Sequence, residues 1–317
     1  MGRKRAAALG PHRLVACADL EPELARQLAA GHPGCDPERT VQDLMQRSDV
    51  EAVLVCTTND ALAQLATVAV EAGKHVLLEK PGARRLAELQ GLRAAADRYG
   101  SVVKVGYNHR FHPALAQAQQ LFRDGAIGDL MYIRGRYGHG GRAGYEREWR
   151  ASREISGGGE LLDQGCHLID LARWFAGDFT DVSGRLGTWF WPMAVEDNAF
   201  ISLATDAAVV AWLHASWTEW KNTFSFEVFG RSGKLQVDGL GGSYGPERLT
   251  WYRKLASGAP QAQTFEYPAE DMSWSAEIEH FAECIEQQRQ PEGNLDDAAA
   301  VLDIIEQLYA RSSHGFR

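Results

Sequence analysis

An aspartate and a histidine lie four residues apart in a segment that predicts a buried helix. Asp163 and His167 would share one face of that helix, one turn from each other. A carboxylate that accepts a hydrogen bond from one imidazole nitrogen fixes the tautomer and makes the other nitrogen a better base. Asp170 is a second candidate for orienting His167. An ordinary core histidine is the alternative, but the preceding glycines 157–159 favour a site, since glycine permits close approach of a ligand.

Further polar residues follow apolar runs that predict strands. In parallel α/β sheets, ligands bind beyond the carboxyl ends of the strands. Asp19, after the run 13–18, is expected to accept hydrogen bonds from an adenine ribose and to favour NAD over NADP. Lys80 is a charged donor for a substrate oxygen or the nicotinamide region. Helix capping explains Asp19 and Asn59 equally well, and a surface ion pair explains Glu79 with Lys80. The candidates for cofactor contact at these strand ends are Asp19, Thr57, Thr58, Asn59, Glu79, Lys80 and Pro81.

Two different patterns of apolar residues divide the chain. In the first part, continuous apolar runs alternate with helical segments, which predicts an α/β fold: a doubly wound parallel sheet covered on both faces. From about residue 130 the apolar residues alternate, which predicts an open, mainly antiparallel α+β sheet with helices on one face. We therefore expect a Rossmann-like dinucleotide-binding domain over 1–125 and a substrate-binding and oligomerisation domain over 126–317. The C-terminal helix is expected to pack back on the first domain. The expected strands are 13–18, 52–56, 75–78, 102–105, 131–137, 199–203, 209–216 and 224–229, and the expected helices include 19–30, 61–72 and 84–99.

Composition narrows the class of protein. The chain of 317 residues carries 33 Lys and Arg against 42 Asp and Glu, a net charge of −9, which argues against a nucleic-acid partner. No apolar run approaches the ~20 residues that span a bilayer, so no membrane partner is expected. Five scattered cysteines without a CxxC pair indicate reduced thiols in the cytoplasm and no metal site. All nine tryptophans lie between Trp149 and Trp274, where they fill a core or offer aromatic faces to sugar rings.

Three motifs together resemble the Gfo/Idh/MocA oxidoreductases: Glu79-Lys80-Pro81, the segment 108–113 (Asn-His-Arg-Phe-His-Pro), and Asp163-x-x-x-His167-x-x-Asp170 after the glycines. The resemblance implies that Lys80, Asp163 and His167 match the family's catalytic trio. His167 would exchange the proton of a substrate hydroxyl while a hydride passes between that carbon and the nicotinamide. It further implies a sugar-type substrate, NAD as cofactor and a homo-oligomer, dimer or tetramer. Residues expected to contact the substrate or its boundary with the cofactor are Asn108, Arg110, Trp149 and Arg150.

The start of the chain departs from this family. A Rossmann domain opens with a strand and G-x-G-x-x-G, whose glycines let the backbone approach the pyrophosphate. Here Gly2 would be the third glycine, and Gly2 with Arg3 would form the first turn of the phosphate-facing helix. One explanation is a true start upstream by roughly ten to a dozen residues, the length of a strand and a phosphate loop. The other is a cofactor-free homologue that binds sugars or regulates without catalysis.

The substrate is less well defined by the sequence. Arg142, Arg150 and Lys221 offer cationic partners for a nucleotide sugar or another phosphorylated sugar. A free cyclitol or simple aldose is the alternative. The run 214–222 mixes aromatic side chains with donors, as sugar pockets do, and the glycine-rich segment 241–245 could form a flexible loop over a phosphate. For both segments an ordinary strand and turn is the alternative, and the sequence favours it.

Overall fold

The computed structural model describes residues 1–268 and 270–312, and the chain divides into two compact units. The first unit contains residues 1–106 together with 274–296. The second contains residues 107–273 and the chain from residue 297 onward. The boundary expected near residue 125 therefore falls inside the second unit. The helical tail is shared between the units, since its first helix belongs with the first unit and most of its last helix with the second.

The first unit is built from parallel strands. Three strands pair in the order β3-β4-β5, and the short strands β1 and β2 pair separately, also in parallel. This confirms the predicted doubly wound parallel design. The strands are β1 (Ala16–Cys17), β2 (Asp36–Pro37), β3 (Ala52–Val55), β4 (His75–Leu78) and β5 (Val103–Val105). The helices are α1 (Gly2–Ala7), α2 (Pro22–Ala30), α3 (Val41–Gln46), α4 (Asn59–Glu71), α5 (Leu86–Tyr99) and α9 (Ser273–Glu286).

Strand β4 shows why the strands of this parallel sheet are continuous apolar runs in the sequence. Val76, Leu77 and Leu78 are all fully buried, because helices cover both faces of the sheet and no side of the strand meets water. The strand expected at 13–18 is shorter in the structure. The carboxylate of Asp19 accepts the backbone N–H of Glu21 at 3.0 Å, so a turn separates β1 from α2. Pro22 then begins the helix, where its missing N–H costs nothing.

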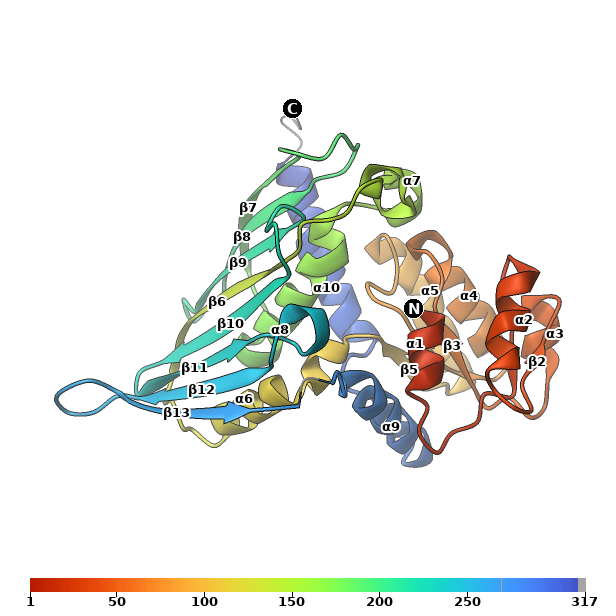
Figure 1. Ribbon diagram of the computed structural model, residues 1–317, viewed down its shortest axis with the longest axis horizontal. Coiled ribbons are helices and arrows are strands. Elements are labelled where there is room, and N and C mark those ends of the chain that lie inside the picture. Colours follow the sequence, from red (N-terminus) through yellow and green to blue (C-terminus); the bar gives the residue numbers. More distant parts are fainter. Residues whose placement is uncertain (269, 313–317) are drawn as a thin grey trace. The chain divides into compact units, whose positions relative to one another are not determined.

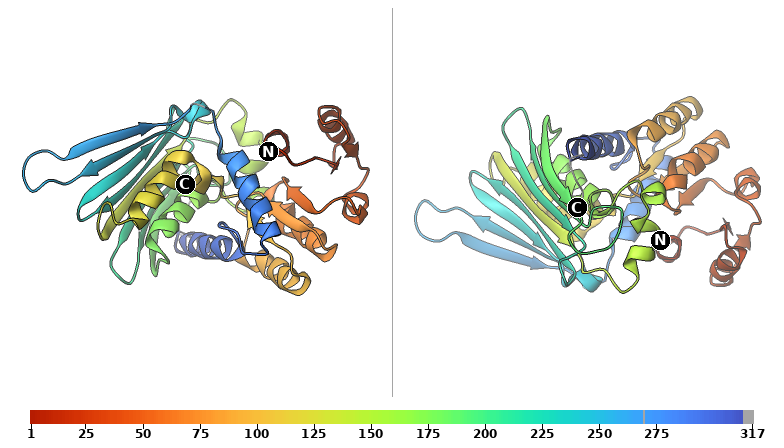
Figure 2. Two further views of the ribbon diagram at one scale, coloured as in Figure 1. Left: turned by 90° about the horizontal axis from the view of Figure 1, so that it is seen from below. Right: turned by 90° about the horizontal axis from the view of Figure 1, so that it is seen from above.

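The second unit is an open eight-stranded sheet in the order β13-β12-β11-β10-β6-β9-β8-β7. β6 and β9 run parallel and the other neighbouring pairs run antiparallel. Helices α6, α8 and α10 lie on one face of the sheet (Figures 1 and 2). The strands are β6 (Leu130–Gly138), β7 (Asp181–Gly187), β8 (Asn198–Ala204), β9 (Val210–Ser216), β10 (Thr223–Gly230), β11 (Gly233–Asp238), β12 (Arg248–Arg253) and β13 (Gln261–Glu266). The long helices are α6 (Pro113–Arg123), α8 (Cys166–Ala176) and α10 (Leu295–Arg311).

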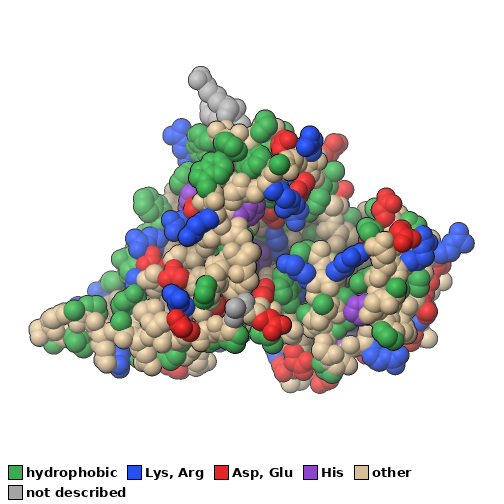
Figure 3. Space-filling view, in the orientation of Figure 1, with side chains coloured by type: hydrophobic (Ala, Val, Ile, Leu, Met, Phe, Trp, Pro, Cys, Tyr) green, Lys and Arg blue, Asp and Glu red, His purple; other side chains and the backbone are tan. Residues whose placement is uncertain are grey.

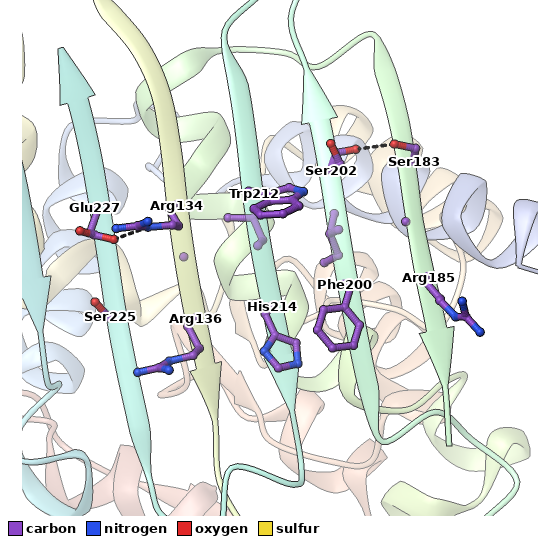
Figure 4. A pocket seen from close by; sticks show the side chains of 14 residues that line it. Arg134, Arg136, Ser183, Arg185, Phe200, Ser202, Trp212, His214, Ser225 and Glu227 are labelled. Atoms are coloured by element: carbon purple, nitrogen blue, oxygen red, sulfur yellow. Dashed lines mark hydrogen bonds and ion pairs between the residues drawn. The ribbon is translucent and has the colours of Figure 1, made fainter. Parts of the chain in front are cut away.

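The two faces of this sheet differ as the alternating sequence predicts. In β9 the side chains of Ala211, Leu213 and Ala215 are buried against the helices, while Trp212 on the other face is 68% exposed. That outer face forms a shallow hollow of about 660 Å³ (Figure 4). The labelled side chains that line it include Arg134, Arg136, Arg185, Phe200, Trp212 and His214. The outer face of the sheet thus carries apolar and cationic side chains, whereas the inner face carries apolar side chains buried under the helices.

The surface charges and the helices of the described residues agree with what the composition predicts. On the face drawn in Figure 3, acidic and basic side chains are interspersed. Within residues 1–268 and 270–312, no helix combines the length and apolar character needed to cross a membrane.

Candidate functional site

The helix that carries Asp163 and His167 opens with a π-helical turn, η4 (Leu161–Gly165), and continues as α8. Its apolar side chains, including Leu161, Leu168 and Ile169, are fully buried against the sheet. Asp163 therefore lies in a wider turn than the regular α-helix expected from the sequence. π-Helical turns are rare and are frequently found at functional sites, where they displace a side chain from its regular direction.

The ring of His167 is enclosed by aromatic side chains. His109 stacks on it with ring centroids 3.8 Å apart and planes at 22°. Tyr107 and Tyr137 approach it edge-on, at 6.1 and 6.3 Å between centroids. His167 is only 4% exposed. Sequence reasoning missed these three neighbours, although Tyr137 follows the buried alternation of β6 and His109 belongs to the segment 108–113.

Asp163 lies beside a cation. Its Oδ2 is 3.2 Å from Nε of Arg150, which is carried by the short turn η3 (Trp149–Ala151). The guanidinium also lies over the ring of Trp149, with its carbon 4.6 Å from the ring centroid. Burial of Arg150 works to lower its pKa, but the charge of Asp163 outweighs this and raises it. The structure thus brings Arg150 and Trp149 to the predicted site. It adds His139, whose pKa is lowered by burial while Asp163 works to raise it.

Arg110 and Asp170 bind each other in the structure. Nε of Arg110 is 2.9 Å from one oxygen of Asp170, and Nη2 is 2.5 Å from the other. Nη2 is also 3.1 Å from Asp297. Both partners are buried, and burial raises the pKa of Asp170 even though Arg110 works to lower it. Asp170 therefore binds Arg110 rather than orienting His167. Arg110 braces η1 (Asn108–Phe111) against α8, and its contact with a substrate stays a prediction.

Asn108 is likewise engaged within the second unit. Its Nδ2 donates to Oγ of Ser273 at 2.8 Å, and its Oδ1 lies 3.3 Å from Nδ1 of His109. The side chain is buried. Asn108 holds His109 in the structure, and its contact with the cofactor stays a prediction.

The glycine run 157–159 packs against protein groups rather than a ligand. Gly157 has φ of +87°, which ends α7 (Arg153–Ser156) in the left-handed region. A Cβ on Gly158 would overlap the hydroxyl of Tyr309, and one on Gly159 would overlap the backbone of Glu196. Oε1 of the buried Glu196 accepts hydrogen bonds from Gly159 N–H at 3.0 Å, Leu161 N–H at 3.1 Å and the Tyr309 hydroxyl at 2.7 Å. Glycine is required here so that this carboxylate can hold the start of η4.

The segment 241–245 also contributes to the site. Gln164 donates from Nε2 to the hydroxyl of Tyr244 at 3.0 Å, and the ring of Tyr244 lies 5.2 Å from that of Tyr137. Burial raises the pKa of Tyr244 to about 12. The loop is thus tied to the helix of Asp163, which the sequence did not predict.

In the first unit the predicted cofactor residues gather at the carboxyl ends of the parallel strands. Val55 of β3 pairs with Leu78 of β4, so the segments 57–59 and 79–81 that follow lie at the same edge of the sheet. The peptide bond between Lys80 and Pro81 is cis. Glu79 points away from solvent and accepts from Nε of Arg5 at 2.8 Å, while Arg5 also pairs with Glu277. Glu79 is therefore bound by protein and supports the turn that presents Lys80.

The remaining predicted contacts are placed as follows. Asp19 is exposed after β1, and Asn59 begins α4 as a buried residue. The hydroxyl of Thr58 donates to Asp60 at 2.6 Å. Gly2 is the first residue of α1, and Arg3 donates to Gln27 of α2 at 2.8 Å. Hydroxyls and an amide after β3, and an exposed carboxylate after β1 in the separate β1-β2 pair, are donors and acceptors that suit a dinucleotide.

Comparison with known proteins agrees with the division of the chain into two units. The profile described as "Oxidoreductase family, NAD-binding Rossmann fold" matches residues 2–107, and the Gfo/Idh/MocA C-terminal domain profile matches residues 115–236. Levoglucosan dehydrogenase of Pseudarthrobacter phenanthrenivorans is 32% identical over 59% of this chain and 49% of its own length. A Comamonas testosteroni dehydrogenase of a chlorinated carboxy-dihydroxycyclohexadiene is 30% identical over 77% and 59%. The chain thus spans about half the length of these curated relatives. scyllo-Inositol 2-dehydrogenase of Bacillus subtilis is 26% identical over 89% and 80%.

Solved structures give the same result for the fold. Levoglucosan dehydrogenase in complex with NADH superposes with a TM-score of 0.88 at 23% identity, over 99% of this chain and 94% of that one. An aldose-aldose oxidoreductase from Caulobacter crescentus superposes with 0.86 at 26% identity, over 98% and 93%. Fold and sequence together define a chain with a Rossmann domain followed by an open-sheet domain. The chain belongs to the Gfo/Idh/MocA family.

Proposed function

We propose that this protein transfers a hydride between NAD and a hydroxyl-bearing carbon of a sugar or cyclitol. The observation that carries the proposal is the buried His167, enclosed by three aromatic rings on the same helix as an Asp163 that is paired with Arg150. An imidazole is suited to exchanging a proton with an alcohol, and a carboxylate on the same helix can orient it. Named relatives act on levoglucosan and scyllo-inositol, which supports a polyol substrate.

The roles of the residues follow from their chemistry. His167 takes the proton of the substrate hydroxyl during oxidation and returns it during reduction. Asp163 orients His167 and stabilises its protonated form, and Arg150 pairs with Asp163 at 3.2 Å. Lys80, at the cis turn after β4, donates a hydrogen bond to the reacting oxygen. Bound nicotinamide supplies the hydride chemistry, while the protein supplies position and proton transfer.

A neutral polyol suits the second unit better than a phosphorylated sugar. Two of the three cations that favoured a phosphate are already paired. Arg142 lies 2.6 Å from Glu148, and Arg150 lies between Glu148 and Asp163. A phosphate would have to compete with these carboxylates for the same nitrogens, whereas the hydroxyls of a neutral sugar can share them. We therefore place the free sugar or cyclitol ahead of the nucleotide sugar.

The outer face of the sheet supports a homo-oligomer. Trp212 is 68% exposed, Phe200 is 46% exposed, and Phe200 stacks on His214 at 4.2 Å. Apolar area of this kind on a sheet favours burial against a second copy. Sedimentation at micromolar concentration tests this: a dimer or tetramer supports it and a monomer contradicts it.

Cofactor binding and turnover are tested in one series. Titration with NADH and NADPH, followed by tryptophan fluorescence, should show binding, with NADH preferred because of Asp19. NADH formation is then followed by absorbance over a panel of free sugars, cyclitols and sugar phosphates. His167→Asn should bind NADH as the parent does and lose turnover by about 10²–10⁴-fold. If neither nucleotide binds to the folded protein, the cofactor-free sugar-binding alternative replaces the proposed function.

A further inference from the structure

The histidine that stacks on His167 is His109, which belongs to a chain of polar contacts through Asn108 and Ser273 to Asp271. The rings of His109 and His167 are nearly parallel with centroids 3.8 Å apart, and both are about 4% exposed. Imidazole faces at this spacing are in direct contact. The two residues come from different elements, η1 and α8, so their contact is made by tertiary packing.

The ring of His109 is fixed at its Nδ1 edge. Oγ of Ser273 donates to Asp271 at 2.6 Å, so its lone pair is available for Nδ2 of Asn108, which lies 2.8 Å away. This sets the amide of Asn108, whose Oδ1 then faces Nδ1 of His109 at 3.3 Å. An acceptor at that nitrogen requires Nδ1 to carry the hydrogen. Both the orientation and the tautomer of His109 thus follow from Asn108.

Other rings hold the remaining faces of His109. Tyr137 lies 5.1 Å away, His112 lies 5.5 Å away and Phe224 lies 5.9 Å away, between ring centroids. His112 is itself anchored by Glu247, whose Oε2 is 2.9 Å from Nδ1. The other oxygen of Glu247 accepts the N–H of Ala114 at 2.6 Å, at the start of α6. His109 therefore has little freedom to rotate.

We propose that His109 is a positioning residue: by stacking on His167 it holds the plane of the imidazole that exchanges the substrate proton. This rests on the proposed function of His167. A general base works only when its nitrogen points along the path of the proton, and a small misplacement can cost about 100-fold in rate. α8 fixes the Cα of His167 but leaves rotation about the side-chain bonds. The immobile His109 ring removes that freedom without touching the substrate.

The test compares two replacements of His109 in the full-length protein. His109→Phe keeps a flat ring for stacking, while His109→Leu keeps apolar volume without one. In His109→Leu we expect kcat to fall by about 10–100-fold, with KM and NADH affinity unchanged. In His109→Phe we expect kcat within about threefold of the parent. The solvent deuterium isotope effect on kcat should rise in His109→Leu, because proton transfer becomes limiting. His12→Leu, at an exposed position in the first unit, is the matched control.

A second readout keeps the inference separate from the proposed function. In histidine-labelled protein, the ring signals of His167 should move in His109→Leu and stay near their parental position in His109→Phe. If the parent has no turnover but these shifts occur, the stacking role stands and the hydride-transfer proposal fails. Unchanged His167 signals together with unchanged kcat in His109→Leu would overturn the stacking role. So would an equal loss of kcat in both variants, since the retained ring would then have no effect.

Discussion

Removing the hydroxyl of Tyr309 tests how the start of the helix that carries Asp163 and His167 is held. This hydroxyl donates to Oε1 of Glu196 at 2.7 Å, and the same oxygen accepts the N–H groups of Gly159 and Leu161. Glu196 is fully buried. A hydrogen bond to a charged group contributes about 1.5–3 kcal/mol, so we expect Tyr309→Phe to lower the free energy of unfolding by about 2 kcal/mol at pH 7.5. The ring remains in place, so no large cavity forms.

The pH dependence of this loss follows from the buried carboxyl. Burial raises the pKa of Glu196 above its ordinary value of 4.5, although the Tyr309 hydroxyl and the backbone N–H groups work to lower it. A carboxyl whose pKa is higher in the folded than in the unfolded protein stabilises the fold most when the pH is below its unfolded pKa. That stabilisation is lost as the pH rises through the pKa of the folded state. Loss of the donor makes the ionised form still less favourable. The difference between Tyr309→Phe and the parent should therefore be larger at pH 7.5 than at pH 4.5, where it should approach about 1 kcal/mol.

Urea unfolding at both pH values, followed by tryptophan fluorescence, measures this difference. Tyr99→Phe is the control, since Tyr99 is 45% exposed at the end of α5. In a Glu196→Gln background the loss should be about 1 kcal/mol and independent of pH, because the amide keeps an acceptor without a charge. A loss below about 0.5 kcal/mol at pH 7.5, or a larger loss at pH 4.5, would refute the reasoning.

Three further outcomes follow from the structure. Arg5→Met should destabilise the first unit by about 3–5 kcal/mol, because it removes the cation that the buried Glu79 and Glu277 share, although Lys104 stays 3.8 Å from Glu277; thermal unfolding measures this, and Arg26→Met on the surface of α2 is the control. Gly159→Ala should lower both stability and turnover, since its Cβ would overlap the backbone of Glu196; equal melting temperatures for variant and parent would contradict this. Burial lowers the pKa of His280 to about 4, and its Nε2 accepts the N–H of Glu292 at 3.1 Å. Stability that is present above pH 6.5 should therefore be lost as the pH falls toward 4, and His280→Gln should reduce that loss in melts at pH 7 and 4.5.

The sequence predicted the architecture well because a strand buried on both faces is continuously apolar, whereas a strand buried on one face alternates apolar and polar residues. Val76–Leu78 of β4 and the alternation around Trp212 in β9 are direct examples. The short strand β2 was not predicted, since two exposed residues, Asp36 and Pro37, carry no such pattern. The compact units differ from the division expected near residue 125, since α9 belongs to the first unit through packing between residues far apart in the chain.

The sequence predicted only the part of the candidate site that depends on local spacing. Local spacing identified Asp163 and His167, and Arg150 was named among the residues near them. It could not show that Arg110 would be bound by Asp170 across two elements, or that the glycines would face Tyr309. Both contacts join residues distant in sequence, and no periodicity encodes their partners. His109 was visible in the segment 108–113, but its stacking on His167 depends on how η1 meets α8.

The Arg5 ion pairs bear on the order in which the chain can fold as it is synthesised. Arg5 lies 74 residues from Glu79 but 272 residues from Glu277, and α9, which carries Glu277, belongs to the first unit. Domains usually fold from the N-terminus as they leave the ribosome. Here the first unit cannot complete its charge balance or bury Leu77 under Ile278 and Phe281 until the second unit has almost wholly emerged. The first unit therefore stays incomplete long after its N-terminal part is made, so a nascent chain stalled before α9 should expose Leu77 and bind chaperones.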